Sequence, residues 1–241
     1  MLLSELVTNN MYQPSNEFSE AIFMVDKPLG WTSFDVVKKV RHALNIKKIG
    51  HAGTLDPLAT GLLLLCSGRQ TKNISSIQAL DKVYTGQIVL GKTTPSMDLE
   101  TPFDSLSSYD HITEEMVITA AATFVGSIMQ IPPIYSAVKV DGKRAYQIAR
   151  KGEAVVLTPR AVMIRSFLIT KIELPFIAFK VVCSKGTYIR QLAHDLGKKL
   201  GVGAYLHSLC RTQIGNYCLD KAYSLERLLQ SNSVSIYKRG S

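Results

Sequence analysis

The sequence predicts an α+β fold with a mixed or mostly antiparallel sheet, flanked by helices and loops. Apolar runs of strand length and patterns of helical period are interspersed along the chain, without the regular strand–helix alternation that builds a parallel sheet. The composition, 46% hydrophobic and 20% charged, is that of a globular protein. We expect strands over residues 22–25, 83–90, 161–171, 176–183 and 213–219, and helices over 34–44, 113–124, 144–150, 187–200 and 224–230.

In the first half of the chain, turn and capping residues mark where elements begin and end. The apolar run 22–25 leads into a Pro-Leu-Gly turn. Thr32 or Ser33 caps the next helix, because a hydroxyl accepts a hydrogen bond from the free N–H groups of a first turn. The strand over 83–90 stops at a glycine, and two prolines with four acidic residues predict a loop over 93–110.

In the second half, Thr113 caps a helix whose first turn carries two glutamates, which the helix dipole favours. The strands 161–171 and 176–183 meet at Pro175. The helix over 187–200 has a continuous apolar stripe, two lysines in its last turn and a glycine directly after it. The short helix over 144–150 closes at a nearby glycine.

Charge and length limit the possible partners. The chain has 28 Lys and Arg against 19 Asp and Glu, a net charge of +9, which favours a polyanion such as nucleic acid or an anionic membrane. The longest fully apolar run, 62–66, is far too short to span a bilayer, so we expect no membrane partner. No linker divides the chain, so we expect one domain over 20–230, between a tail over 1–19 and a tail over 231–241.

Cysteine usage and the N-terminus indicate a cytoplasmic protein. The four cysteines show no C-x-x-C spacing and no histidines at zinc-ligand spacing, so we expect neither a disulfide framework nor a metal site. Residues 1–19 contain no Lys or Arg and so lack the basic start of a signal peptide.

The segment 53–63, Gly-Thr-Leu-Asp-Pro-Leu-Ala-Thr-Gly-Leu-Leu, holds the most informative residue of the chain. It places the carboxylate of Asp56 in a turn between the basic residues Lys47, Lys48 and His51 and the apolar run 62–65. The apolar run predicts a buried element that holds the turn rigidly. Asp-Pro pairs often mark simple turns. On so basic a chain, the alternative is carboxylate chemistry on an anionic substrate. Phosphate-loop, dinucleotide-binding and nucleophile-elbow motifs are absent from the sequence.

Residues 183–190 supply a cationic partner. Gly186 frees the backbone just before a helix start, and the exposed N-terminus beside Lys185 and Arg190 is a natural anion site. Arg190 can also pair with a carboxylate from elsewhere in the fold, which keeps that carboxylate ionised.

Five segments together resemble the signatures of the TruB family of tRNA pseudouridine synthases. The likeness runs in order from residue 22 to about 219, which makes it far more specific than any single motif. The segments are Val25–Ser33, Gly50–Gly61, Lys82–Tyr84, Gln130–Lys139 with Gly142, Tyr146 and Arg150, and Gly186–Arg190 with Asp195–Gly197 and Leu209–Thr212.

The resemblance implies the pseudouridine synthase fold, with a catalytic cleft across the sheet, and a reaction at uridine 55 in the TψC arm of tRNA. It implies Asp56 as the catalytic aspartate. It implies no cofactor and no metal, and we expect a monomer without a protein partner. The implied substrate-binding residues are Tyr84, stacked on the uracil; Arg190, holding Asp56; Tyr188 and Leu209, lining the uridine pocket; and His51, meeting bases of the RNA loop.

Two departures from the family pattern accompany the likeness. Many relatives carry a further RNA-binding domain of the PUA type, whereas only one helix and a short tail follow the last matching segment here. The loop 94–101 lacks the glycine expected after its acidic pair. A second reading of the chain is a tRNA-binding or tRNA-folding module on the same fold, whose catalysis is dispensable.

Overall fold

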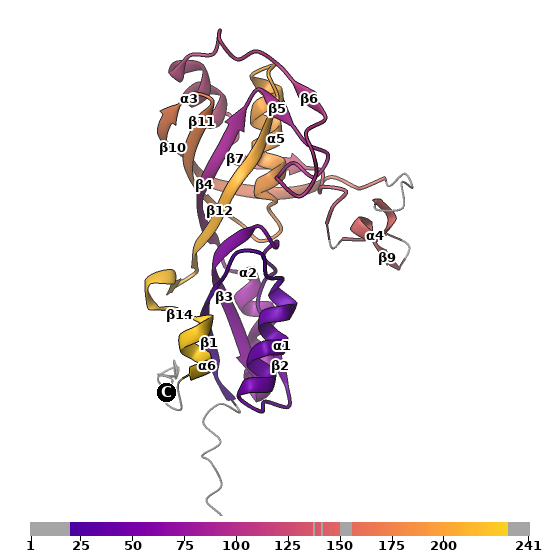
Figure 1. Cartoon of the computed structure of the whole chain (residues 1–241), viewed down its shortest axis with the longest axis vertical. Coiled ribbons are helices and arrows are strands. Elements are labelled where there is room, and N and C mark those ends of the chain that lie inside the picture. The colour runs from indigo at the N-terminus through magenta and orange to yellow at the C-terminus, as the bar shows by residue number, and fades with distance from the viewer. Residues whose placement is uncertain (1–19, 137, 141, 150–155, 231–241) are drawn as a thin grey trace, which may run out of the picture.

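The computed structural model describes residues 20–136, 138–140, 142–149 and 156–230. One ten-stranded sheet runs through both lobes of an elongated molecule (Figure 1). Its strand order is β14-β1-β3-β12-β4-β11-β10-β7, with β2 beside β3 and β13 beside β12. The pairs β1–β14 and β3–β12 are parallel and the other pairs are antiparallel. The expected mixed, mostly antiparallel α+β sheet is confirmed.

The elements have the following bounds. The strands of the large sheet are β1 (Ile22–Lys27), β2 (Ile49–His51), β3 (Ala59–Ser67), β4 (Lys82–Leu90), β7 (Gly126–Gln130), β10 (Arg160–Glu173), β11 (Phe176–Cys183), β12 (Ala204–Ile214), β13 (Tyr217–Cys218) and β14 (Tyr223–Ser224). Two small hairpins join β5 (Lys92–Thr93) to β6 (Ser105–Leu106) and β8 (Lys139–Val140) to β9 (Lys143–Arg144). The α-helices are α1 (Ser33–Ala43), α2 (Ile74–Ala79), α3 (Glu114–Ala122), α4 (Ala145–Ala149), α5 (Ile189–Lys199) and α6 (Leu225–Gln230).

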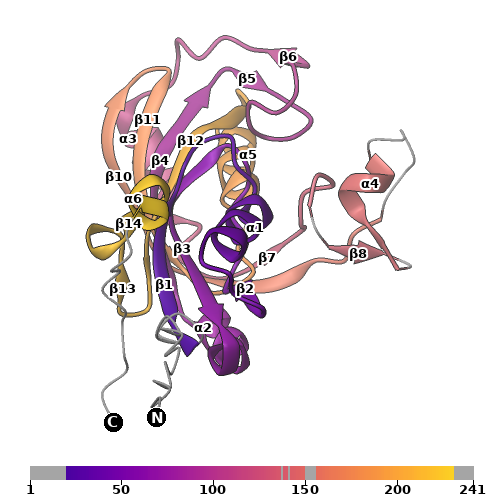
Figure 2. The same cartoon turned by 60° about the horizontal axis from the view of Figure 1, so that its bottom comes forward.

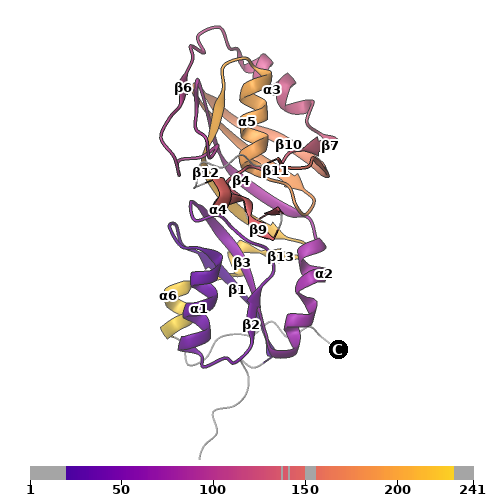
Figure 3. The same ribbon diagram turned by 90° about the vertical axis from the view of Figure 1, so that its right-hand side faces the viewer.

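Strand β3 is the buried element predicted from its run of leucines. Its side chains alternate between two faces, as in any strand. Leu63 and Leu65 pack in a core cluster with α1 and α6, while Leu62 and Leu64 pack in another with Ile77 of α2. All four leucines are fully buried, because helices cover both faces of the sheet in this lobe (Figure 3).

The other lobe is covered by α3 and α5 (Figure 3). The apolar stripe of α5 packs against β4, β11 and β12, and its predicted residues are buried. The predicted caps also form. Thr32 makes a capping box with Asp35 at the start of α1, and Thr113 accepts a hydrogen bond from the N–H of Met116 at the start of α3.

Strand β12 corrects the prediction for this region. We expected a strand over 213–219, but the strand is Ala204–Ile214, and a turn separates it from the two-residue β13. The pattern concealed it because polar residues such as Arg211 stand in its middle, and the buried guanidinium of Arg211 finds its hydrogen-bond partners in residues 53, 54 and 62, far away in the sequence. This long strand lies in the centre of the sheet.

The pairing register of β12 brings residues of β3 and β4 to either side of it, in the middle of the molecule. Arg211 pairs with Gly61 of β3 on one side and with Tyr84 of β4 on the other. On the next strand, Val181 of β11 pairs with Tyr84. Gly61 has a φ of +96°, and a Cβ there would lie 2.4 Å from the carbonyl oxygen of Arg211, so only glycine fits this close approach. Segments far apart in the chain therefore meet where β3 begins.

Smaller differences concern connecting segments. The predicted loop 93–110 contains β5 and β6 of a small hairpin, and the prediction missed α2 and β7. The predicted helix 144–150 is α4, which stands away from the main body beside β8 (Figure 2), and its expected end near Gly152 lies outside the described residues. The tails predicted over 1–19 and 231–241 also lie outside them.

Candidate active site

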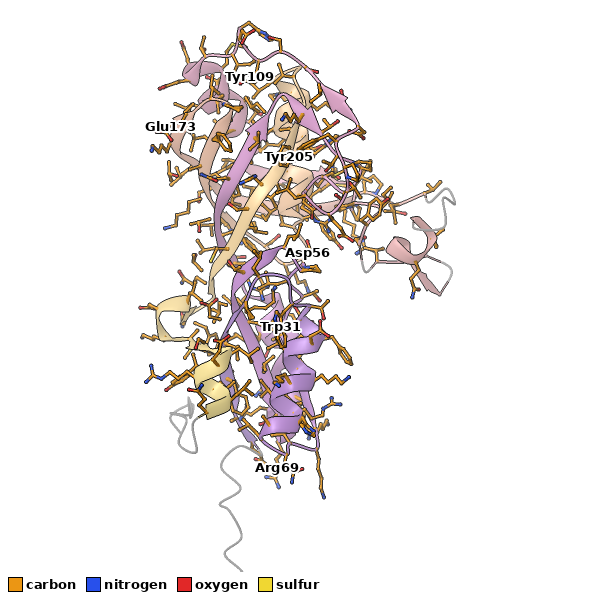
Figure 4. All side chains as sticks on the ribbon, in the orientation of Figure 1. Trp31, Asp56, Arg69, Tyr109, Glu173 and Tyr205 are labelled. Atoms are coloured by element: carbon orange, nitrogen blue, oxygen red, sulfur yellow. The ribbon has the colours of Figure 1, made fainter. Side chains whose placement is uncertain are left out.

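Asp56 lies where the two lobes meet (Figure 4), and its carboxylate forms an ion pair with the guanidinium of Arg190. Nε of Arg190 donates to Oδ2 of Asp56 at 2.9 Å. Its Nη1 donates to the carbonyl oxygen of Ser96 and its Nη2 to that of Tyr135, each at 3.0 Å. Only 4% of the Arg190 side chain is exposed, against 40% for Asp56. The guanidinium is therefore fixed on three sides, while the carboxylate remains accessible.

A second carboxylate, which sequence reasoning did not select, lies beside this pair. Oδ2 of Asp98 is 3.5 Å from Nε of Arg190, and the Asp98 side chain is 6% exposed. Asp98 belongs to the loop 94–101, which lacks the glycine of the family pattern. Met97 takes a φ of +64° there, a left-handed conformation unusual for a side-chain-bearing residue. The only signal in the sequence was an acidic residue inside a loop, which is too common to be informative.

Burial raises the pKa of the Asp56 carboxyl above its ordinary value. Arg190 opposes this rise by stabilising the ionised form, and the nearby charge of Asp98 adds to it. We expected that pairing alone would keep the carboxylate ionised. Enclosure has the larger effect, so the carboxylate is more basic and more reactive towards an electron-poor or acidic atom than an exposed aspartate.

Three buried polar side chains hold the loop that carries Asp56. Arg211, 1% exposed, donates from Nη2 to the carbonyl oxygen of Gly53 at 3.1 Å and from Nη1 to that of Thr54 at 3.3 Å. Its Nε donates to the carbonyl oxygen of Leu62 in β3 at 2.8 Å. Arg211 thus ties the loop to the strand that follows it.

Ser33 and Lys27 hold the other peptide groups of this loop. Oγ of Ser33 accepts from the N–H of Leu55 at 2.8 Å and donates to its carbonyl oxygen at 3.1 Å. Nζ of Lys27 donates to the carbonyl oxygens of Trp31 at 2.6 Å and Pro57 at 3.3 Å. Burial lowers the pKa of Lys27 to about 8. The peptide groups on both sides of Asp56 are therefore anchored, which is a preorganised arrangement.

A cavity of about 520 Å³ opens beside Asp56, in the usual range for sites that take small molecules. Its walls come from the Asp56 loop, from β4 and β12, and from the segment that leads into α5. Five of the six predicted site residues line it: Asp56, Tyr84, Tyr188, Arg190 and Leu209. Arg160, Lys185 and Arg211 also line it and give it a cationic character.

His51, the sixth predicted residue, is not among the residues that line this cavity. It ends β2 and is partly buried, and burial lowers its pKa, with Arg211 adding to the effect. Its Nδ1 is buried without a hydrogen-bond partner in the described part of the chain. The structure therefore places His51 near the loop but not in the cavity.

The side chain of Gln130 fixes the backbone of Tyr188. Its Oε1 accepts from the N–H of Tyr188 at 2.8 Å and its Nε2 donates to the carbonyl oxygen of Tyr188 at 3.0 Å. Tyr188 is the N-cap of α5, so we were wrong to place it in the first helical turn. Gly186, with a φ of +82°, forms the bend before it. Gln130 thus joins the end of β7 to the wall of the cavity.

Comparisons with known proteins identify the family. The profile described as the TruB family pseudouridylate synthase N-terminal domain matches residues 41–189. A second profile, the tRNA pseudouridylate synthase B C-terminal domain, matches residues 190–237. A protein of Parabacteroides distasonis called tRNA pseudouridine synthase B is 50% identical over 224 residues, which cover 89% of this chain and 95% of the relative. This chain belongs to the TruB family of pseudouridylate synthases.

Further relatives agree with membership of the TruB family. The tRNA pseudouridine synthase B of Flavobacterium johnsoniae is 48% identical over 88% of this chain and 96% of the relative. Among solved structures, a Cbf5-Nop10-Gar1 complex matches with a TM-score of 0.69 and 27% identity, over 90% of this chain and 55% of that one. The chain thus spans about half the length of this solved relative. A chain of the archaeal box H/ACA sRNP Nop10-Cbf5 complex matches with a TM-score of 0.66 and 25% identity, over 88% of this chain.

The TruB relatives confirm the enzyme class and the fold predicted from the sequence. The chain is a pseudouridine synthase, an isomerase, with the α+β pseudouridine synthase fold. In the part of the chain that the structure describes, no cluster of three His, Cys, Asp or Glu side chains could hold a metal ion. Across the same residues, every helix is too short or too polar to cross a membrane.

Proposed function

We propose that this chain converts uridine 55 in the TψC arm of tRNA to pseudouridine, with Asp56 as the catalytic residue. The observation that carries the proposal is the Asp56–Arg190 ion pair at a cavity able to admit a nucleotide. The names of the relatives, which specify tRNA, support the substrate class.

The reaction breaks the N1–C1′ bond of uridine, turns the uracil and joins C5 to C1′. The proton on C5 is lost and N1 gains one, so the product is an isomer and no oxidant or energy source is consumed. The carboxylate of Asp56 either attacks C1′ or removes the proton at C2′, and both routes need its ionised form. Since Oδ2 accepts the hydrogen bond from Arg190, Oδ1 is the oxygen available to the ribose.

Three other lining residues contact the base in this proposal. A uridine inside an RNA loop must leave its stack, which costs a few kcal/mol. Stacking on the ring of Tyr84 returns about 1–3 kcal/mol. Tyr84 is suited to this because it lines the cavity from the central strand β4 and is held rigidly, with 8% of it exposed. Tyr188 and Leu209 enclose the base from the neighbouring walls. His51, which lies outside the cavity, meets neighbouring bases of the RNA loop in this proposal.

The cationic residues at the cavity bind phosphate in this proposal. Lys185 and Arg160 are exposed and line the cavity, next to the N-terminus of α5. Their contacts with the RNA backbone make affinity depend on salt, because phosphate binding releases counterions. Residues 20–230 act as one catalytic domain, a division supported by the continuous sheet. Both members of the ion pair come from one chain, so a monomer suffices, and its tRNA substrate puts the enzyme in the cytoplasm.

The alternative is a tRNA-binding or tRNA-folding module with dispensable catalysis, and it does not explain the Asp56–Arg190 ion pair. A binding module gains nothing from a buried guanidinium held against an accessible carboxylate, since removing the charge of Arg190 from water has a large cost in free energy. A carboxylate that is fixed by a buried guanidinium and still open to the cavity is what a catalyst requires.

The test is conversion of an unmodified tRNA transcript labelled with tritium at C5 of its uridines. Forming the C5–C1′ bond releases the label to water, and one labelled position should react without added cofactor. The variant Asp56→Asn should bind the transcript with nearly wild-type affinity and release no tritium. The matched control is Asp110→Asn, at an exposed aspartate, which should retain full activity. Tritium release by Asp56→Asn at the wild-type rate would contradict the catalytic assignment.

A further inference from the structure

The exposed side of α1 and the turn after it concentrate the positive charge of the chain. Residues 38–48 contain five Lys and Arg and no Asp or Glu, more than half of the net charge of +9. All five side chains are exposed: Lys38, Lys39, Arg41, Lys47 and Lys48. None of them forms an ion pair with another residue of the described ranges. So dense an array repels itself, and a polyanion relieves that repulsion.

Part of this surface is shaped as a shallow groove of about 450 Å³. Its lining residues, which define the α1 groove, are Gly30, Trp31, Asp35, Lys38, Lys39 and His42. The one acidic member, Asp35, accepts hydrogen bonds at Oδ2 from the N–H and the hydroxyl of Thr32, at 3.1 and 2.5 Å. These hydrogen bonds lower the pKa of Asp35, so its carboxylate stays ionised, but Lys38 and Lys39 outnumber it and the groove presents a net positive charge to a ligand.

The α1 groove begins next to the catalytic loop. The N–H of Gly30 donates to the carbonyl oxygen of Pro57 at 2.9 Å, and Lys27 bonds the carbonyl oxygens of both Trp31 and Pro57. The groove therefore starts at the end of α1 that is tied to the Asp56 loop. Since a helix rises about 1.5 Å per residue, the lysines and histidine of the groove lie roughly 10–15 Å further along α1. That distance is beyond the reach of a nucleotide bound at Asp56.

We infer that the α1 groove is a second RNA contact, which binds the phosphodiester backbone of the substrate outside the target loop. The inference rests on the proposed function, because it takes the substrate to be an RNA that extends beyond the flipped uridine. Charge favours a polyanion, and continuity with the catalytic loop favours the RNA already bound there. Phe34, 63% exposed beside the lysines, adds an aromatic face of the kind on which nucleotides stack.

The test compares the double variant Lys38→Ala/Lys39→Ala with the matched pair Lys198→Ala/Lys199→Ala. Both pairs are adjacent, exposed helical lysines, and both variants lose two charges, but the second pair lies at the far end of α5 from the cavity. Affinity for an unmodified full-length tRNA transcript is measured at 50 and 200 mM salt. Each lost phosphate contact lowers the slope of log affinity against log salt by about 0.9.

Raising the salt from 50 to 200 mM weakens RNA binding by both proteins. The factor by which affinity falls should be about ten times smaller for the groove variant than for wild type. The control pair should keep the wild-type slope. At saturating enzyme, single-turnover tritium release by the groove variant should equal that of wild type, because the lysines do not touch the reacting nucleotide. Its thermal unfolding should also be unchanged, since both side chains are exposed.

Two results would overturn the inference. One is a wild-type salt slope in the groove variant, and the other is the same loss of slope in both pairs, which would mean that only overall charge matters. The proposed function fails separately, if wild-type protein forms no pseudouridine in the transcript. If wild-type protein forms pseudouridine and the groove variant keeps the wild-type slope, the proposed function stands and only the inference about the α1 groove is wrong.

Discussion

Arg190 follows Asp56 by 134 residues, yet its Nε lies 2.9 Å from Oδ2 of that aspartate. The guanidinium is buried and uses its other nitrogens on two backbone carbonyl groups, so it has one position available to it. The carboxylate therefore has a fixed orientation before any substrate arrives.

Replacing Arg190 by lysine should disable the enzyme. An ammonium group cannot reproduce a planar fork that reaches Asp56, Ser96 and Tyr135 together. A buried polar group left without a partner costs about 1–3 kcal/mol, so single-turnover tritium release should fall by about 10- to 100-fold. The control is Arg165→Lys, at an exposed ion pair with Asp81, where little change is expected. Full activity of Arg190→Lys would show that the orientation of Asp56 does not depend on the guanidinium.

The pH profile should report the enclosure of Asp56. Its pKa is raised above the ordinary value, and the proposed chemistry needs the ionised form. Activity should therefore fall as pH drops through an apparent pKa higher than that of an exposed aspartate. The same shift means that ionising Asp56 disfavours the folded state, so stability contributed by the neutral carboxyl is lost as pH rises through the folded pKa.

Two measurements check this prediction. The acid limb of kcat/KM should lie above the ordinary aspartate range, and the stability of Asp56→Asn relative to wild type should increase across the same pH interval. An acid limb at or below the ordinary value would mean that the carboxylate is not desolvated in solution.

Removing the guanidinium of Arg211 should loosen the catalytic loop. The variant Arg211→Met leaves the carbonyl groups of Gly53, Thr54 and Leu62 without their donor. Stability in urea should fall by about 3 kcal/mol or more, and turnover should fall with it. Arg41→Met is the control, since Arg41 is exposed and makes a single 3.4 Å contact with the carbonyl oxygen of Ile49. Wild-type stability in Arg211→Met would refute the anchoring role.

Gln130 should control how Tyr188 is presented to the substrate. The variant Gln130→Leu removes both hydrogen bonds to the Tyr188 backbone, each worth about 1 kcal/mol. We expect KM for tRNA to rise several-fold, because the wall of the cavity becomes less ordered, while Gln87→Leu, at an exposed position of β4, should have no effect. Steady-state kinetics on the transcript distinguish the two. Unchanged KM and kcat in Gln130→Leu would show that the two hydrogen bonds from Gln130 to the Tyr188 backbone do not affect substrate binding.

Sequence patterns predicted the residues of the site better than their geometry. Tyr84, Tyr188 and Leu209 were selected by resemblance and all line the cavity. Asp98 was missed, because nothing in the sequence places its loop against Arg190. Ser33 was considered only as a helix cap, but Thr32 caps α1 and the hydroxyl of Ser33 binds Leu55 instead.

The fold was predictable wherever local chemistry decides it. Thr113 starts α3 through its own hydroxyl, and the leucines of β3 predict burial from hydrophobicity alone. Strand β12 was predicted wrongly because Arg211 is acceptable inside the sheet only where backbone carbonyl groups from other segments surround it.

The sequence by itself determined the Thr113 cap, the buried leucines and the family, because these depend on neighbouring residues or on short segments read in order. The tertiary structure alone decided that β12 lies between β3 and β4, so that Asp56, Tyr84 and Arg190 surround one cavity. The physical reason is that strand order and register come from the packing of the whole sheet between its helices, to which residues more than a hundred positions apart contribute together.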